Sequence, residues 1–221
     1  MQNSPWRWII GVLLCLAATI NAAPAAADEA AVNSMVLKLI DRMPTGGGYE
    51  WESTGVPHTI RHQGKVVLKK TSADGTYCSG ITFTVAMEAA KRSRLIRDKS
   101  FEEIKTFQRQ WYGTNEVSAE TQCVYALEQL GIGYAVEHDD AQAGDFLQFW
   151  RGKSGHSVIF LAWETDDEGN RVGIRYWSTQ TATDGIGVHT EYFNNAEGFK
   201  GSVDPNRVYL GRMSRLDNDG D

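Results

Sequence analysis

The apolar residues of this 221-residue chain change their spacing near residue 131, and this change constrains the fold more than any other feature. Before that point, apolar side chains recur every three or four residues, which is the spacing of helices that bury one face. After it, short alternating or apolar runs are separated by turn residues, which is typical of strands. Helices followed by strands predict an α+β domain, with helices packed against an antiparallel sheet of about five or six strands.

The pattern also predicts the position of each element. A packing helix is expected at residues 28–43, and further helices at a segment beginning with Cys78 and at residues 100–111 and 118–130. Strands are expected at residues 134–137, 145–150, 156–163, 171–178, 187–192 and 207–213. The length suits one domain, which we expect at residues 28–216, before a disordered tail at residues 217–221.

Residues 1–27 have the composition of a secretory signal peptide. Arg7 supplies a positive charge, residues 9–20 are mostly apolar, and residues 25–27 are three alanines that suit a cleavage site. The apolar run is short for a bilayer span. We therefore expect removal of the signal, export to the periplasm or outside the cell, and no stable membrane insertion afterwards.

The charge of the chain argues against some classes of partner. The formal net charge is −6 at pH 7, and removal of Arg7 with the signal makes it more negative. Nucleic acids and anionic membranes are bound by basic surfaces that replace counterions. The sequence therefore predicts no nucleic-acid partner, and it does not indicate a protein partner.

Two cysteines, Cys78 and Cys123, lie outside the predicted signal. In an oxidising compartment they are compatible with a disulfide. The surroundings of Cys78 favour a different interpretation, because it opens a predicted helix after the loop residues Gly75 and Thr76. Backbone N–H groups and the helix dipole stabilise a thiolate at that position. We therefore expect Cys78 to be a reactive nucleophile, largely ionised near neutral pH.

Other residues complete a candidate catalytic set. Ser79 and Gly80 are small enough to leave room for a substrate carbonyl, and the backbone N–H groups at Ser79 are candidates for an oxyanion hole. His156 lies at the start of an apolar strand and is the candidate base. A third group should orient its imidazole. Ser178 and Gln180 share one face of the following strand, and Gln180 has the longer reach.

Three separated motifs resemble those of NlpC-type cell-wall cysteine peptidases, which have a papain-like fold. Cys78-Ser79-Gly80 is similar to the Asp-Cys-Ser-Gly motif of that family, with Tyr77 in place of the aspartate. Residues 144–150 and 155–161 resemble its Gly-Asp strand and its histidine-bearing strand. Residues 48–51 are similar to its Pro-Tyr-x-Trp-Gly segment. The motifs occur in the family order, over about residues 46–180.

The resemblance implies a reaction and a substrate. Cys78 would attack an amide carbonyl in the peptide stem of peptidoglycan, and water would hydrolyse the acyl-enzyme without a metal or other cofactor. Tyr49 and Trp51 would lie beside the substrate. The family often has histidine as its third residue, and the related CHAP amidohydrolases place Glu and Asn at the spacing of Ser178 and Gln180. Residues 56–73 and 100–130 depart from the compact family core.

Two alternatives stay open at this point. One is an acyltransferase with the same nucleophile, in which an amine or alcohol replaces water. The other is a non-catalytic cell-wall-binding domain, in which Cys78 and Cys123 form a structural disulfide. The sequence does not identify the bond that is cleaved.

Overall fold

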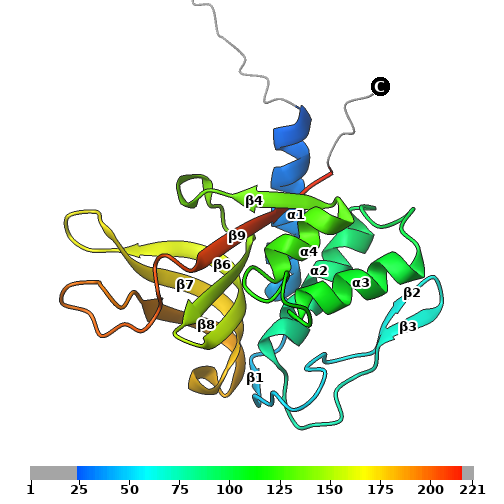
Figure 1. The fold of residues 1–221 in the computed structure, drawn as a ribbon, viewed down its shortest axis with the longest axis horizontal. Coiled ribbons are helices and arrows are strands. Elements are labelled where there is room, and N and C mark those ends of the chain that lie inside the picture. The colour runs from blue at the N-terminus through cyan, green and yellow to red at the C-terminus, as the bar shows by residue number, and fades with distance from the viewer. Residues whose placement is uncertain (1–23, 216–221) are drawn as a thin grey trace, which may run out of the picture.

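The computed structural model describes residues 24–215. Most of the predicted signal peptide and the predicted tail at residues 217–221 lie outside this range. The described part is an α+β domain in which the helices gather beside one face of a twisted sheet (Figure 1). The predicted fold class is therefore confirmed at this level. Within residues 24–215, no helix has the length and apolar character needed to cross a bilayer.

The first helix, predicted at residues 28–43, begins at Pro24 and ends at Ile40, and residues 41–43 form a turn. The other helices agree with the predicted positions, except at the start of the last one. The helices are α1 (Pro24–Ile40), α2 (Cys78–Arg92), α3 (Phe101–Trp111) and α4 (Cys123–Leu130). Ser100 and Glu103 form the expected capping box of α3, and Gly131 ends α4 in the left-handed conformation with φ of 69°. The last helix was predicted to begin at residue 118. It begins later because Gln122 has φ of 41°, which interrupts helical backbone.

The main sheet has seven strands, where about five or six were expected, and all of its neighbouring strands are antiparallel. Its spatial order is β1-β8-β7-β6-β5-β9-β4. The strands are β1 (Gly46–Gly47), β4 (Gly133–Val136), β5 (Phe146–Arg151), β6 (Ser154–Thr165), β7 (Arg171–Gln180), β8 (Gly185–Tyr192) and β9 (Val208–Met213). The unexpected strand is β1, a pair of glycines without an apolar pattern. A separate hairpin, β2 (Ile60–His62) and β3 (Lys65–Leu68), lies within residues 56–73.

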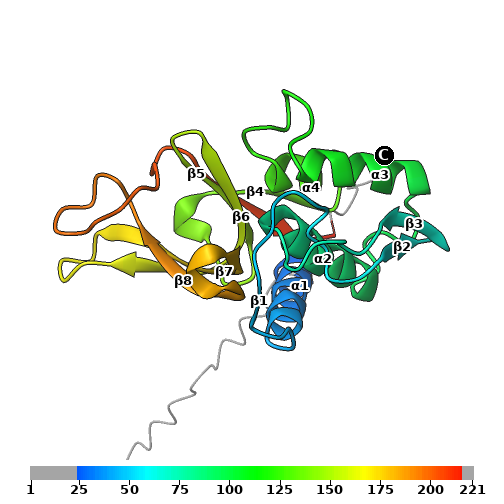
Figure 2. The same cartoon turned by 90° about the horizontal axis from the view of Figure 1, so that it is seen from below.

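Side chains from the two faces of the sheet enter different cores. The face toward the helices contributes Phe146, Ile159 and Trp177 to a core shared with α1 to α4. The other face contributes Leu147, Val158 and Tyr176 to a second core that also contains Phe193 and Val203. Figure 2, which views the molecule from below, also shows the helices on one side of the main sheet. Because both faces of β6 are covered, its sequence is a nearly continuous apolar run.

Asp145 connects three parts of this fold. Its carboxylate is fully buried and accepts hydrogen bonds from Arg212 of β9, at 2.8 and 2.9 Å. It also accepts from Asn33 of α1 at 2.8 Å and from the backbone N–H of Gln142 at 2.8 Å. The aspartate of the Gly-Asp motif therefore has a structural role here, holding α1 and β9 beside the start of β5.

Candidate active site

Cys78 is the first residue of α2, as predicted. Tyr77, at the N-cap position, has extended backbone, and its side chain does not cap the helix. The first backbone N–H groups of α2, including that of Ser79, therefore lack a side-chain cap. They can donate hydrogen bonds to an oxygen that becomes negatively charged during a reaction. Ser79 itself is 3% exposed.

Gly80 has a different role from the one expected. A Cβ atom there would lie 2.5 Å from the carbonyl oxygen of Thr54 and 2.4 Å from the carbonyl carbon of Gly55. The space beside Gly80 is thus occupied by the backbone of residues 54–55 and is not open to a substrate carbonyl. Glycine is required because two chain segments approach closely at the start of α2.

The environment of Cys78 also differs from the expectation. The thiol is only 2% exposed, and burial raises its pKa. The backbone N–H of Ser157 and the side chains of Ser79 and Tyr77 act in the opposite direction, but burial has the larger effect. Burial thus acts on the pKa of Cys78 in the opposite direction to the helix-start effect from which a thiolate was expected.

His156 lies in β6, and its imidazole packs against two aromatic rings that also contact each other. The centroids of Phe149 and Tyr176 are each 5.5 Å from that of His156, and both rings meet it edge to face, with interplanar angles of 74°. The side chain is 3% exposed. Burial, and then the positive charge of Arg151, lower the pKa of His156 to about 4. The imidazole is therefore neutral at pH 7, which is the form that a general base requires.

Cys78 and His156 approach the same segment of β6. The Cys78 thiol interacts with the backbone N–H of Ser157, which is the residue directly after His156. Among the described residues, no hydrogen bond joins the thiol to the imidazole itself. Successive side chains of a strand point to opposite faces of the sheet. Ser157 faces Ser79 of α2, whereas His156 packs on Phe149 and Tyr176 of the second core, on the face away from the helices. The structure therefore brings Cys78 to the β6 backbone but places the predicted base on the opposite face of the sheet, so it does not bring the two side chains together.

The two candidates for the third residue occupy different environments. Gln180 interacts with His156 and raises its pKa, although the Nε2 atom of His156 and the Oε1 atom of Gln180 are both buried without a hydrogen bond of standard geometry. The amide nitrogen of Gln180 donates to Thr183. Ser178 instead donates to the backbone carbonyl of Ser157, at 2.8 Å. The geometry thus favours Gln180 as the partner of the imidazole and leaves Ser178 as a support for the β6 backbone.

Sequence reasoning missed a buried polar cluster around Ser157. The hydroxyl of Ser157 lies 2.6 Å from the Oε1 atom of Gln148, 3.3 Å from that of Gln122 and 3.5 Å from the hydroxyl of Ser79. Ser157 and Gln148 are 1% and 0% exposed, within otherwise apolar strands. Such polar residues need partners when they are buried. Their presence in two apolar runs was the signal that could have revealed the cluster.

Tyr49 and Trp51, the predicted substrate contacts, are placed differently from one another. The Tyr49 ring lies 6.3 Å from that of Tyr77, and burial together with the nearby Cys78 raises the pKa of Tyr49 to about 12. Residue 49 is held by a bridge to Thr76. Trp51 is 67% exposed. Tyr49 therefore borders the Cys78 region, whereas Trp51 is available to solvent.

The two cysteines do not form a disulfide. Cys78 and Cys123 are both free thiols, and both are buried. Burial raises the pKa of Cys123 to about 12. The interpretation of the pair as a structural bridge is therefore contradicted. Within residues 24–215, no group of three or more histidine, cysteine, aspartate or glutamate side chains is arranged to hold a metal ion.

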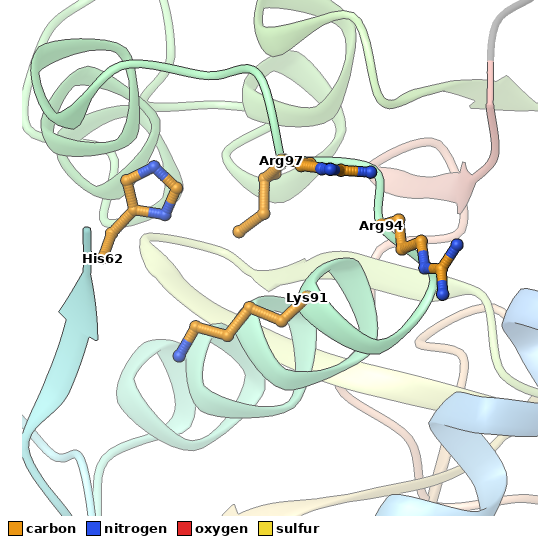
Figure 3. Close-up of a pocket in the computed structure, with 5 residues that line it drawn as sticks. His62, Lys91, Arg94 and Arg97 are labelled. Carbon is orange, nitrogen blue, oxygen red and sulfur yellow. The ribbon is translucent and has the colours of Figure 1, made fainter. Parts of the chain in front are cut away.

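A cavity of about 470 Å³ lies apart from the candidate site. Figure 3 shows its basic lining, which consists of His62, Lys91, Arg94, Ile96 and Arg97. Lys91 is paired with Glu88 at 3.3 Å, and the Nε2 atom of His62 lies 2.6 Å from a backbone carbonyl. Neither Cys78 nor His156 lines this cavity.

Comparison of the chain with protein-family models, with curated proteins and with solved structures finds no match. The likeness to the NlpC-type peptidases therefore rests on the sequence motifs.

Proposed function

We propose that the protein is an exported cysteine hydrolase with a papain-like, NlpC-type fold, which cleaves amide bonds in peptidoglycan stem peptides. Cys78 is the nucleophile and His156 the general base. The observation that carries the proposal is a thiol at the uncapped start of α2, in contact with the backbone N–H of Ser157. Pairing with His156, whose ring lies on the other face of β6, requires the start of β6 to rearrange when substrate binds. The family motifs and the predicted signal peptide support the substrate class.

The charge states favour an attack coupled to proton transfer. Because burial raises the pKa of Cys78 and lowers that of His156, the resting pair is a neutral thiol and a neutral imidazole. Once the imidazole has reached the Cys78 side of β6, His156 accepts the thiol proton as the sulfur bonds to the amide carbon, and the uncapped N–H groups of α2 stabilise the oxyanion. His156 then protonates the amine as the C–N bond breaks, which leaves a thioester on Cys78.

Hydrolysis of the thioester completes the cycle. His156 takes a proton from water as the water oxygen attacks the thioester carbon. When the C–S bond breaks, the imidazolium returns that proton to the departing sulfur, which restores the neutral thiol and the neutral imidazole. The reaction consumes one water and releases a carboxylate and an amine. Since Cys78 is 2% exposed, we expect substrate binding to displace neighbouring side chains, of which Tyr49 and Tyr77 lie near the thiol.

Digestion of purified peptidoglycan, followed by mass analysis of the fragments, tests this function. The protein should release fragments with a new amine and a new carboxyl group, and Cys78→Ala should release none. Cys123→Ala is the matched control, because Cys123 is also a buried free thiol but opens a different helix, and it should retain the activity. A single amide product after addition of an amine would indicate transfer. Equal fragment release by Cys78→Ala, or no cleavage of any peptidoglycan, would contradict the proposal.

A further inference from the structure

A network of charged and polar side chains joins three strands on the face of the sheet that carries His156. Arg151 of β5 donates through Nε and Nη2 to both carboxylate oxygens of Glu191 on β8. Tyr176 of β7 donates its hydroxyl to Glu191, at 2.6 Å. The side chains of Arg151 and Glu191 are 27% and 16% exposed, and Tyr176 is fully buried.

This network contacts both aromatic rings against which the imidazole packs. Tyr176 is one of these rings, and its hydroxyl is fixed by Glu191. The other ring, Phe149, has the Arg151 guanidinium 4.9 Å from its centroid. Glu191 is the centre of the arrangement, because it binds Arg151 on one side and Tyr176 on the other. Loss of its carboxylate would remove the hydrogen bond of Tyr176 and the ion-pair partner of Arg151 at once.

The charges of the network act on His156 in opposite directions. Arg151 lowers the pKa of His156 and Glu191 raises it, while burial gives the largest downward effect. The remaining titratable groups that face the imidazole are His189, which lowers its pKa, and Tyr176. Gln180 contributes a neutral dipole. Removal of the Glu191 charge leaves the positive Arg151 beside the imidazole, and removal of the Arg151 charge leaves the negative Glu191. The two removals should therefore shift the pKa of His156 in opposite directions.

We propose that Glu191 is a positioning residue for the His156 imidazole: with Arg151 and Tyr176 it fixes the two mutually packed rings against which the imidazole lies. The inference rests on the proposed function for its catalytic meaning. Its structural part is independent, because it concerns an imidazole whose geometry and titration can be measured without substrate. An ion pair that only stabilised the sheet would need no connection to either ring.

An NMR titration of the His156 imidazole tests the inference in the wild type and in Glu191→Gln and Arg151→Gln. Glu191→Gln should make the imidazolium about tenfold more acidic, and Arg151→Gln about tenfold less acidic. Glu120→Gln is the control, because Glu120 forms a similar bidentate pair with Arg207 elsewhere and should leave the titration unchanged. Shifts in the same direction, or no shift, would overturn the inference.

If Glu191→Gln or Arg151→Gln does not fold, a second pair of variants tests the inference. Glu191→Asp and Arg151→Lys retain the charges but lose the bidentate geometry. They should give doubled or broadened imidazole signals, and a single sharp signal at the wild-type position would contradict the positioning role. Opposite titration shifts without any amide cleavage would leave this inference standing and reject the proposed function. Amide cleavage without titration shifts would do the reverse.

Discussion

Gln180 and Ser178 lie two residues apart on β7, yet their hydrogen bonds assign them different tasks. The Gln180 amide is anchored through its nitrogen to Thr183 and interacts with His156 through its other end. The Ser178 hydroxyl is already used by the backbone carbonyl of Ser157. An orienting group needs a free acceptor near the imidazole, and Oε1 of Gln180 is buried without a hydrogen bond.

Substitution should separate these two residues. Gln180→Ala removes the group that orients the imidazole, so we expect kcat to fall on the order of 10²-fold with KM little changed. Ser178→Ala removes one neutral hydrogen bond and should cost about 1 kcal/mol of unfolding free energy, with kcat within a few-fold of the wild type. Steady-state kinetics and denaturant titration of both variants measure these effects. A larger loss of kcat in Ser178→Ala would assign the orienting role to Ser178.

Single residues also show where sequence reasoning stops. The position of Cys78 at a helix start followed from local pattern, because the helical spacing begins there. Its burial did not, because the start of α2 is covered in part by the backbone of Thr54 and Gly55, which precede it by more than twenty residues. From the sequence, Gly80 is expected to leave space for a substrate. In the structure, the backbone of Thr54 and Gly55 occupies that space.

At the scale of elements, the prediction was accurate wherever side-chain periodicity is strong. The six predicted strands of the main sheet and the starts of α2 and α3 were found because each buries a regular apolar face. The two-residue strand β1 was missed, because Gly46 and Gly47 have no side chains from which a pattern can arise. The start of α4 was misplaced, because the positive φ of Gln122 is not encoded by hydrophobic spacing.

The attachment of α1 and β9 to β5 depends on Asp145. Asp145→Ala would remove the only carboxylate shown to pair with the buried Arg212 guanidinium among the described residues, so we expect a loss of about 3–5 kcal/mol of unfolding free energy. Asp139→Ala is the matched control, because its pair with Arg171 is exposed, with the Asp139 side chain 89% accessible, and should change stability by less than about 1 kcal/mol. Denaturant titration measures both. Equal losses would show that Asp145 does not anchor these elements.

At the scale of the whole molecule, the order of helices before strands was sufficient to predict the α+β class. It was not sufficient for the sheet order, because the pairing of β1 with β8 joins Gly46 to Ile186 across most of the chain. The approach of Cys78 to the His156 segment depends on the same long-range arrangement. The sequence could therefore nominate both residues, but it could not predict the side-chain geometry between them.

The buried His156 makes the stability of the whole molecule depend on pH. Its folded pKa is about 4, below the unfolded value of 6.5, so the unfolded chain binds a proton at a pH where the folded chain does not. Stability from this group is complete above pH 6.5 and falls as the pH decreases toward 4, by about 3 kcal/mol in total. Denaturant titration across this range should show the loss, and His156→Gln should show a flatter dependence. An identical pH dependence in the variant would contradict the burial of a neutral imidazole.

The central claim is that Cys78 and His156 act as one catalytic unit, and turnover of a peptidoglycan stem peptide by four proteins tests it most directly. The proteins are the wild type, Cys78→Ala, His156→Ala and the double variant. We predict that each single variant loses at least about 10³-fold in kcat and that the double variant is no slower than the slower single one, because groups that act together are not additive. Multiplied losses in the double variant, or near-normal turnover in His156→Ala, would contradict the account.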